Sequence, residues 1–408
     1  MKILYINHYA GGPSYGMEFR PYYLAREWVR AGHRVRILAA TYSHVRSVQP
    51  AAGSEVIDGI DHHWVETPPY AGNGVGRAWN IACFLGGVFR LSAAIAREFG
   101  PDVVIASSTY PMDIWVARHL ARRVRPRPAK LIYEVHDLWP LSLIELAGMS
   151  PRHPFALLCQ WAEDAAYGDA DHVVSMLPKV QGHTAARGLD PSRLTIVPNG
   201  VSPDDWELQQ QPLRADVAEA IDRLRRAGAL VVGYAGAMGL PNALDPLLDA
   251  ARSVQGSSLG FVLVGDGHER QRLEQRVARE TIRNVTLLPP IPKVQIPALL
   301  AAIDIAYIGW QRQPIYRFGI APNKLMDYMM AGCAVLHSVE AGNDPVAESG
   351  CGLTVAPEDA AAVAQGLRTL AALSSVERRQ MGQRGRTFVL ANHSYPVLAR
   401  RFLDAIGR

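Results

Sequence analysis

Short apolar runs alternate with amphipathic segments through the first half of the chain. Runs of this length are typical of buried strands, and the segments between them have the 3.6-residue period of a helix. Strands that alternate with helices form parallel sheets covered on both faces, so an α/β domain is expected. The expected strands are 2–7, 33–40, 101–108, 130–137 and 171–177, and the expected helices are 17–32, 111–124 and 154–168.

The same pattern restarts after a polar segment, about 202–212, that is rich in Asp, Gln and Pro. Its strands are expected at 229–236, 260–267, 284–291, 304–310 and 334–338, and the tail 357–408 is expected to be helical. We therefore predict two facing Rossmann-like domains with a cleft between them. Their expected bounds are 1–205 for the N-terminal domain and 206–385 for the C-terminal domain, with a helix in 386–408 that returns to the N-terminal domain.

Composition changes this picture little. The formal net charge is +4, and no basic motif studded with aromatic residues is present, so nucleic acid is not an expected partner. The four cysteines are far apart in sequence, which favours free thiols in a reducing compartment. The longest apolar run, 81–89, is about half the length that spans a bilayer, and no signal peptide is evident. We expect a cytoplasmic protein with at most peripheral membrane contact.

Glycines follow the first strand of each predicted domain. Gly11 and Gly12 come after the first strand, where glycine lets a ligand approach backbone amides closely, although a plain turn is the alternative. Gly236 and Gly239 precede a helix in the second half, and free amides there would make an anion site. Neither loop has the spacing of a dinucleotide fingerprint, so a nicotinamide cofactor is not expected.

His136 ends the strand in "YEVHDLWP". A histidine at the carboxyl end of a central strand can hydrogen-bond a substrate hydroxyl or donate a proton. The neighbouring Asp137 could equally cap the turn that follows.

The stretch "YRFGIAPNKLMDYMMAGCAVLHS", from Tyr316 to Ser338, contains the start of a helix at Pro322. Lys324 and Asp327 are three residues apart, so they share a face of that helix. A lysine beside the positive end of a helix dipole is unfavourable unless an anion lies between it and the backbone amides. The sequence therefore predicts an anion site at this helix start.

Two further groups of residues concern metal binding and lipid binding. No cluster has metal-ligand spacing: His62 and His63 are adjacent on an expected strand and point to opposite faces, so no metal site is expected. The segment from Arg118 to Lys130 carries six cations and no acid. It is either a solvated helix end or a contact for anionic lipid head groups or a lipid diphosphate.

Four stretches together resemble the retaining glycosyltransferases of family four, which have the GT-B fold. They are the N-terminal "MKILYINHYAGGPSYGMEFRPYYLAREWVRAGHRV", the strand end "VHDLWP", the segment "VPNGV" and the stretch at Tyr316. The motifs "ETPPYAGNGVGRAWN" and "YRFGIAPNKLMDYMMAG" are similar to a bacterial branch that builds O-antigen and capsule repeat units from amino-sugar donors.

The resemblance implies a donor site for a UDP-sugar. Asp327 stands where the family usually has a glutamate that holds the ribose, and Ile291 would face the nucleobase. His136 would lie near the sugar, with Gly11 and Gly12 against the donor. Backbone contacts to the sugar and the diphosphate would come from Gly319, Ile320 and Ala321, and the helix start at Pro322 and Asn323 would complete the site.

The sequence also departs from the family pattern. The first of two usual glutamates has no clear counterpart, because "YRFG" occupies its place. The usual arginine and lysine of the diphosphate site fall near Ala237 and Asn242, which carry no charge. We expect Lys324, with Arg317 as a second candidate, to supply the missing charge.

The prediction is thus a metal-independent, retaining transferase in surface polysaccharide biosynthesis, with His136 and Lys324 as catalytic residues. It would move an N-acetylhexosamine from a UDP-sugar to a polyprenyl-diphosphate-linked acceptor at the inner face of the plasma membrane. No cofactor is expected, since the UDP-sugar is a substrate. Two alternatives stay open: a GT-B sugar-nucleotide epimerase, and a non-catalytic partner protein that binds a nucleotide sugar.

Overall fold

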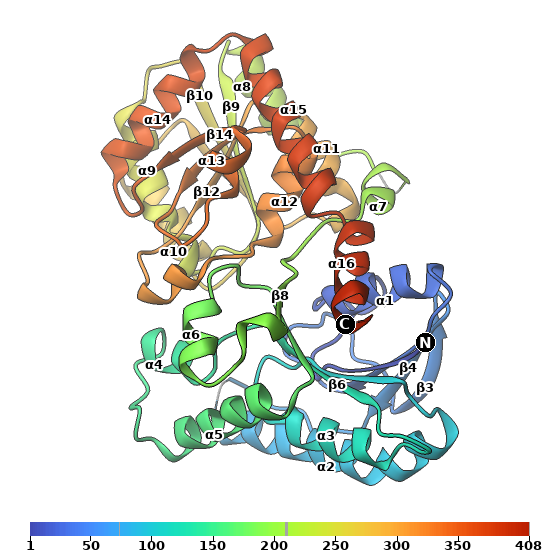
Figure 1. Ribbon diagram of the computed structural model, residues 1–408. Helices are drawn as coiled ribbons and strands as arrows, with labels where there is room; N and C mark the ends of the chain where they lie inside the picture. Colours follow the sequence, from blue (N-terminus) through green and yellow to red (C-terminus); the bar gives the residue numbers. More distant parts are fainter. Residues whose placement is uncertain (73, 209–210, 408) are drawn as a thin grey trace. The chain divides into compact units, whose positions relative to one another are not determined.

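A computed structural model describes residues 1–72, 74–208 and 211–407 (Figure 1). The chain forms two compact units. The N-terminal unit comprises Met1–Asn199 together with Tyr395–Arg408, and the C-terminal unit comprises Gly200–Ser394. Each unit is an α/β domain built on one sheet.

The N-terminal unit contains an eight-stranded sheet in the order β3-β4-β2-β1-β5-β6-β7-β8. All neighbouring strands are parallel except β3 and β4, which form an antiparallel hairpin at the edge. The central strands are apolar and buried, as expected for a sheet covered on both faces. The strands are β1 Lys2–Ile6, β2 Arg34–Ala40, β3 Gly53–Ile57, β4 Ile60–Val65, β5 Val103–Ala106, β6 Lys130–Val135, β7 His172–Ser175 and β8 Leu194–Ile196.

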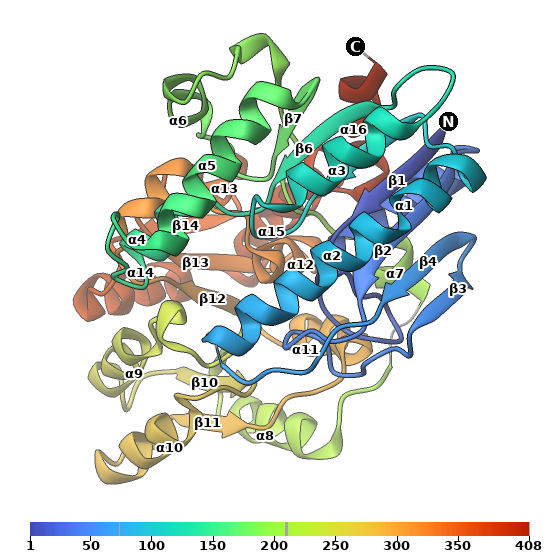
Figure 2. The ribbon, with the colours of Figure 1, turned by 90° about the horizontal axis from the view of Figure 1, so that it is seen from below.

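Helices cover both faces of this sheet. The long helices α2, α3 and α5 lie side by side on one face, and α1 and α16 pack together on the other (Figures 1 and 2). Trp28 of α1 donates its indole N–H to the Ala399 carbonyl at 3.1 Å, and its ring lies 5.1 Å from that of Phe402. The helices are α1 Arg20–Arg30, α2 Val75–Glu98, α3 Asp113–Arg123, α4 Leu141–Glu145, α5 Pro154–Asp169, α6 Gln181–Ala186, the 3₁₀ turn η1 Pro191–Arg193, and α16 Tyr395–Gly407.

The C-terminal unit contains a six-stranded parallel sheet in the order β11-β10-β9-β12-β13-β14. Apolar side chains from α8, α11, α12 and α15 fill one face, and those from α9, α10 and α14 fill the other. The strands are β9 Leu230–Ala235, β10 Leu259–Val264, β11 Val285–Leu288, β12 Ile305–Gly309, β13 Ala334–Ser338 and β14 Gly352–Val355. The helices are α7 Pro203–Leu208, α8 Ala215–Arg226, η2 Leu240–Asn242, α9 Leu244–Ser253, α10 Arg270–Arg279, η3 Lys293–Gln295, α11 Ile296–Ala301, η4 Pro314–Phe318, α12 Asn323–Met330, α13 Pro345–Ser349, α14 Ala360–Ala372 and α15 Ser375–Asn392.

The boundaries differ from those predicted. The first unit ends at Asn199 instead of 205, and the second continues to Ser394 instead of 385. The second difference arises because α15 runs without a break to Asn392 and packs against α12, so only α16 belongs to the N-terminal unit. Part of the predicted linker forms α7, and residues 209 and 210 of that linker lie outside the described residues.

Candidate functional site

Backbone hydrogen bonds within the glycine loop after β1 involve the N–H groups of both predicted glycines. The N–H of Gly11 donates to the Glu18 carbonyl at 2.8 Å, and the N–H of Gly12 donates to the Gly16 carbonyl at 3.0 Å. A Cβ on Gly11 would lie 2.1 Å from the Gly16 carbonyl oxygen, so the loop itself requires this glycine. The prediction that the two amides face a ligand is therefore wrong, because both N–H groups are buried and used inside the loop.

His136, at the end of β6, is held by a buried acid. Its Nε2 lies 2.8 Å from Ser107 Oγ and 3.1 Å from Glu134 Oε2. The Ser107 hydroxyl donates to the same carboxylate at 2.6 Å, so both partners accept from His136 and its Nε2 carries the hydrogen. Nδ1 is then the ring nitrogen left to accept a proton or a hydrogen bond.

The Glu134 carboxylate is part of a fully buried ion pair with Arg20 of α1. Arg20 Nε and Nη2 lie 2.9 and 2.7 Å from Glu134 Oε1, and the guanidinium also donates to the carbonyls of Val197 and Pro198 at 2.7 Å. Burial alone would raise the pKa of Glu134, but Arg20 and His136 outweigh it and hold that pKa well below its usual range. The carboxylate that orients His136 is therefore permanently charged at neutral pH.

Asp137 has a structural role. It accepts from the Leu138 N–H at 2.8 Å, the Ser142 hydroxyl at 3.0 Å and the Trp139 indole N–H at 3.2 Å. These contacts fix the turn into α4, as the capping alternative predicted.

Lys324, in the first turn of α12, reaches the glycine loop after β9. Its Nζ donates to the Tyr234 hydroxyl at 2.9 Å and to Asn242 Oδ1, and it lies 4.7 Å from the centre of the Tyr234 ring. A Cβ on Gly236 would lie 3.2 Å from the lysine Nζ, so the ammonium lies directly against this loop. Lys324 thus approaches Asn242, one of the two positions where the family places a cation.

The Lys324 ammonium has only neutral partners among the described residues. Burial lowers its pKa to about 8. The start of α12 adds to the positive potential, because its N-cap is Pro322 and no side chain accepts from its first amides. Asn323 is exposed and opens the helix. A cation and an uncapped helix start thus adjoin one another, and this is the arrangement that binds an anion.

Two backbone N–H groups in the loop before α12 already have hydrogen-bond partners within the C-terminal unit. The N–H of Gly319 donates to the Tyr316 carbonyl at 2.9 Å, and Gly319 has a φ of 96° that suits only glycine. The Ile320 N–H donates to Asn343 Oδ1 at 2.7 Å, and Asn343 Nδ2 donates back to the Ile320 carbonyl at 3.1 Å. The N–H groups of Gly319 and Ile320 therefore already have partners in the protein, and their backbone contacts to the sugar and the diphosphate stay a prediction. Ala321, which stands between Ile320 and Pro322 in the chain, is half-buried.

Asp327 lies one turn after Lys324 and is half-buried. Burial raises the pKa of its carboxyl group to about 6, and the charge of Lys293 in η3 partly offsets this effect. Ile291, just before η3, is half-buried. It packs against the apolar cluster to which α8, α11, α12 and α15 contribute on one face of the C-terminal sheet. Arg317 is exposed; it donates to the Pro314 carbonyl at 2.6 Å and lies over the Phe318 ring.

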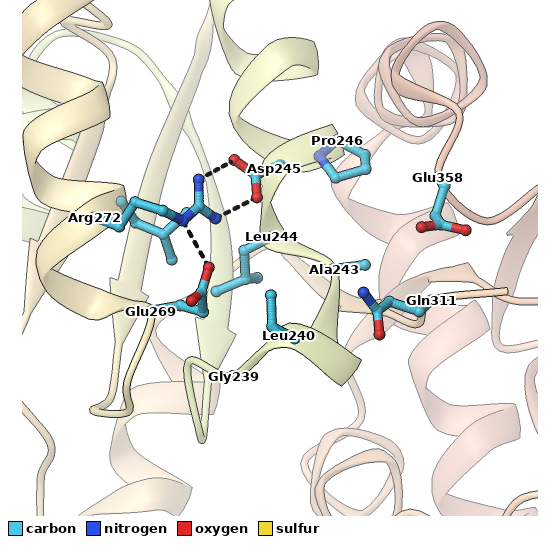
Figure 3. A pocket seen from close by; sticks show the side chains of 11 residues that line it. Gly239, Leu240, Ala243, Leu244, Asp245, Pro246, Glu269, Arg272, Gln311 and Glu358 are labelled. Atoms are coloured by element: carbon cyan, nitrogen blue, oxygen red, sulfur yellow. Dashed lines mark hydrogen bonds and ion pairs between the residues drawn. The ribbon is translucent and has the colours of Figure 1, made fainter. Parts of the chain in front are cut away.

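A cavity of about 90 Å³ lies at the start of α9, next to Gly239 (Figure 3). Its lining includes the acids Asp245, Glu269 and Glu358. Arg272 contacts both Asp245 and Glu269 and so has its charge satisfied (Figure 3). A second anion site at this helix start was predicted, but the Asp245 carboxylate already complements the helix dipole there. The Gly236 end of the loop, beside Lys324, is the part that suits an anion.

The sequence reading missed Glu134, Arg20 and Asn343. Glu134 could have been found, since it is a charged residue inside an otherwise apolar, buried strand. Arg20 and Asn343 gave no local signal, because their partners lie 114 and 23 residues away in sequence. Within the described part of the chain, no group of three or more His, Cys, Asp or Glu residues could hold a metal ion.

Family models match both halves of the chain. A "Glycosyl transferase 4-like domain" matches residues 15–200, and "Glycosyl transferases group 1" matches residues 229–372. The chain therefore belongs to the glycosyltransferase family with the GT-B fold. It is similar to WcaI of Escherichia coli (strain K12), which is named as a colanic acid biosynthesis glycosyl transferase. The two are 24% identical over 246 residues, and the match spans 58% of this chain and 57% of the length of WcaI.

Solved structures share the fold over the whole chain. Sucrose-phosphate synthase from Thermosynechococcus elongatus has a TM-score of 0.72 at 18% identity, covering 99% of this chain and 97% of that one. Anabaena Alr3699/HepE in complex with UDP-glucose has a TM-score of 0.67 at 15% identity, covering 100% and 99%. WaaG, a glycosyltransferase involved in lipopolysaccharide biosynthesis, has a TM-score of 0.66 at 16% identity and covers 99% of each chain.

Proposed function

We propose that the protein transfers a sugar from a UDP-sugar to a lipid-linked acceptor in the biosynthesis of a surface polysaccharide. The observation that carries the proposal is the half-buried Lys324 ammonium, which has only neutral partners among the described residues and adjoins the start of α12, where Pro322 provides no side-chain cap. Such a group favours a bound anion, and the diphosphate of a nucleotide sugar supplies one. The family membership makes a nucleotide-sugar donor the natural choice, and HepE has been solved with UDP-glucose and with UDP.

In the proposed reaction, the bond between the sugar C1 and the diphosphate oxygen breaks, and a new bond forms between C1 and an acceptor hydroxyl. The hydroxyl proton passes to the departing diphosphate. Attack from the face that the leaving group vacates retains the configuration at C1. Lys324 and the α12 amides stabilise the charge that develops on the diphosphate. The transfer reaction is also proposed to need no added metal ion. Transfer activity should therefore persist in excess chelator.

His136 would act on the sugar in this scheme. Glu134 and Ser107 hold its Nε2–H, so Nδ1 is the atom that can contact a sugar hydroxyl. Asp327 would accept from the ribose hydroxyls, and Ile291 would contact the uracil. The donor sugar is proposed to be an N-acetylhexosamine. The acceptor is proposed to be a polyprenyl diphosphate carrying the growing unit at the inner face of the plasma membrane, in keeping with the polysaccharide roles named for WcaI and WaaG.

One experiment separates this function from its two rivals. The protein is incubated with a panel of UDP-sugars, with and without membrane lipid extract, and UDP and sugar products are measured. UDP release that requires the lipid extract supports transfer. A new UDP-sugar formed without lipid would identify an epimerase instead. Tight UDP binding with no product in either arm would leave a nucleotide-sugar-binding partner protein.

A further inference from the structure

The outward face of α2 is apolar where a surface helix normally carries charge. Between Val75 and Phe89 every residue that is exposed is apolar or glycine, and the first exposed charge is Arg90. The Trp79 side chain is 64% exposed. The exposed residues of this stretch are Val75, Gly76, Ala78, Trp79, Ala82, Gly86 and Phe89.

The neighbouring helices extend this face. The N-terminal half of α5 exposes Leu157, Leu158 and Trp161, and the Trp161 side chain is 65% exposed. Trp161 lies 4.8 Å, between ring centres, from the half-buried Trp115 of α3. Since α3 packs between α2 and α5, the three helices form one layer, which Figure 2 shows nearest the viewer. We call this layer the α2–α3–α5 face.

Positive charge adjoins the apolar residues. Phe89 stacks on His119 at 4.4 Å, and Arg123 donates to the same imidazole at 2.8 Å. Arg90 and Arg122 are exposed beside them. Some acids near these helices are engaged: Asp169 pairs with Arg118 and also with Arg122 at 3.8 Å, and Glu98 pairs with Arg97 at 3.0 Å. An apolar area edged by arginines is complementary to a bilayer with anionic head groups.

By length and hydropathy alone, α2 could cross a membrane, and 39% of its most apolar window is buried. Its inner face, however, is part of the folded core: Phe84 and Val88 are fully buried, and Phe84 packs on the His8 ring at 4.6 Å. A spanning α2 would have to abandon these contacts. A helix that buries one face in protein and exposes an apolar face outward suits the plane of a membrane surface.

We propose that the α2–α3–α5 face docks the protein on anionic phospholipid. Trp79, Phe89, Leu157 and Trp161 enter the interfacial region of the bilayer, and Arg90 and Arg123 contact the phosphates. Tryptophan suits this depth because its ring is apolar and its N–H can still reach water or a head group. This inference gives a location to the peripheral membrane contact and does not depend on the identity of the donor or the acceptor.

The test is co-sedimentation of the full chain with sucrose-loaded vesicles, one set of phosphatidylcholine and one of phosphatidylglycerol with phosphatidylcholine. The variant Trp79→Ser/Trp161→Ser removes the two largest apolar groups of the face. The control variant Val56→Ser changes an exposed apolar residue on β3, outside the three helices. Thermal unfolding and the circular dichroism spectrum of each variant establish that folding is intact. No sugar nucleotide is present during sedimentation, so failure of the proposed transfer reaction would not affect the result.

The parent protein is expected to bind the anionic vesicles, and less so at high salt. The double variant should lose about tenfold or more of that partitioning, the scale of removing large apolar side chains from a lipid interface. Val56→Ser should bind like the parent. Equal binding of the parent and the double variant would overturn the proposal. So would a change from dimer to monomer in the double variant with vesicle binding unchanged, because the face would then serve self-association.

Discussion

Each unit holds a cationic side chain near the carboxyl ends of its central strands, but only one of the two has an acid among its described partners. Arg20 in the N-terminal unit forms an ion pair with Glu134 and donates to two carbonyls, and both charged side chains are fully buried. Lys324 in the C-terminal unit is half-buried and contacts a phenol and an amide oxygen, with no carboxylate among its described partners. The first charge is balanced inside the protein, whereas the second is not.

This difference separates a group that maintains structure from one that awaits a ligand. A buried ion pair whose hydrogen bonds are complete has nothing left to offer a substrate, so it can only position its neighbours. A partly desolvated cation without an acid beside it is unfavourable, because it has lost water without gaining a counter-ion. A bound anion would reduce this cost. We therefore infer that Arg20 and Glu134 position His136, and the proposed role of Lys324 is to hold the diphosphate.

The largest expected effect is on stability in the N-terminal unit. Arg20→Met should lower the free energy of unfolding by about 3–5 kcal/mol, because it leaves the Glu134 carboxylate buried without its counter-ion. Lys324→Met should change it by about 1 kcal/mol or less, since it removes a charge that no acid balances. Urea unfolding of both variants makes the comparison. Similar losses for the two would mean that Lys324 is as structural as Arg20.

The next effect concerns turnover. His136→Ala should lower kcat by about 10²-fold, the scale of a lost positioned acid–base or orienting group, while UDP affinity stays unchanged. His63→Ala, a change in a histidine on β4 that bonds Ser54, serves as the control. If His136→Ala instead lowers the melting temperature and leaves turnover per folded molecule intact, His136 only supports its turn.

The Asp327 carboxylate should accept hydrogen bonds from the ribose hydroxyls of the donor nucleotide. Asp327→Asn should reduce the preference for UDP over 2′-deoxy-UDP by about tenfold, because hydrogen bonds to a charged acceptor contribute about 1.5–3 kcal/mol. In the parent this preference should also fall as the pH drops below about 6, where the carboxylate takes up a proton. Calorimetric titration with both nucleotides measures it. An equal loss of affinity for the two would remove Asp327 from the ribose contact.

The last effect is a pH dependence of stability. The pKa of Lys324 is lowered to about 8 in the folded protein from 10.5 when exposed, so the folded chain releases this proton first. Between these values the unfolded chain binds more protons, and the free energy of unfolding gains a contribution that rises with pH. That contribution, obtained by subtracting the pH profile of Lys324→Met from that of the parent, should be flat below pH 8. A flat difference up to pH 10.5 would show that the lysine is not desolvated.

Much of the fold was predictable because its strands are short, apolar and regularly spaced. The parallel strands at 2–7, 130–137 and 304–310 were predicted near their true positions for this reason. The β3–β4 hairpin was missed: its strand β3 is mostly exposed and lacks an apolar run, although Asp58 and Gly59, both with positive φ, mark the turn. The helix α2 was seen only as an apolar run, because its apolar residues lie on both faces and blur the helical period.

The site was predictable in part. Lys324 drew attention because a cation at a helix start conflicts with the dipole, and that conflict is visible in sequence. The glycine amides after β1 were misassigned because sequence does not show which N–H groups a loop uses for itself. Gly11, Gly12 and Gly319 donate within their own loops, and Ile320 donates to the Asn343 side chain in the loop before α13. Residues that act through partners far along the chain, such as Glu134 through Arg20, become apparent only in the folded structure.

The central claim is that Lys324 holds the diphosphate, and the most direct test is calorimetric titration of UDP and uridine into the parent and Lys324→Met. Arg317→Met, in η4, tests the second candidate for the charge at the diphosphate. The parent should bind UDP more tightly than uridine, and Lys324→Met should lose about 1.5–3 kcal/mol of that difference, the scale of one charge-assisted contact, with uridine affinity unchanged. A Lys324→Met variant that keeps the full preference for UDP would contradict the claim.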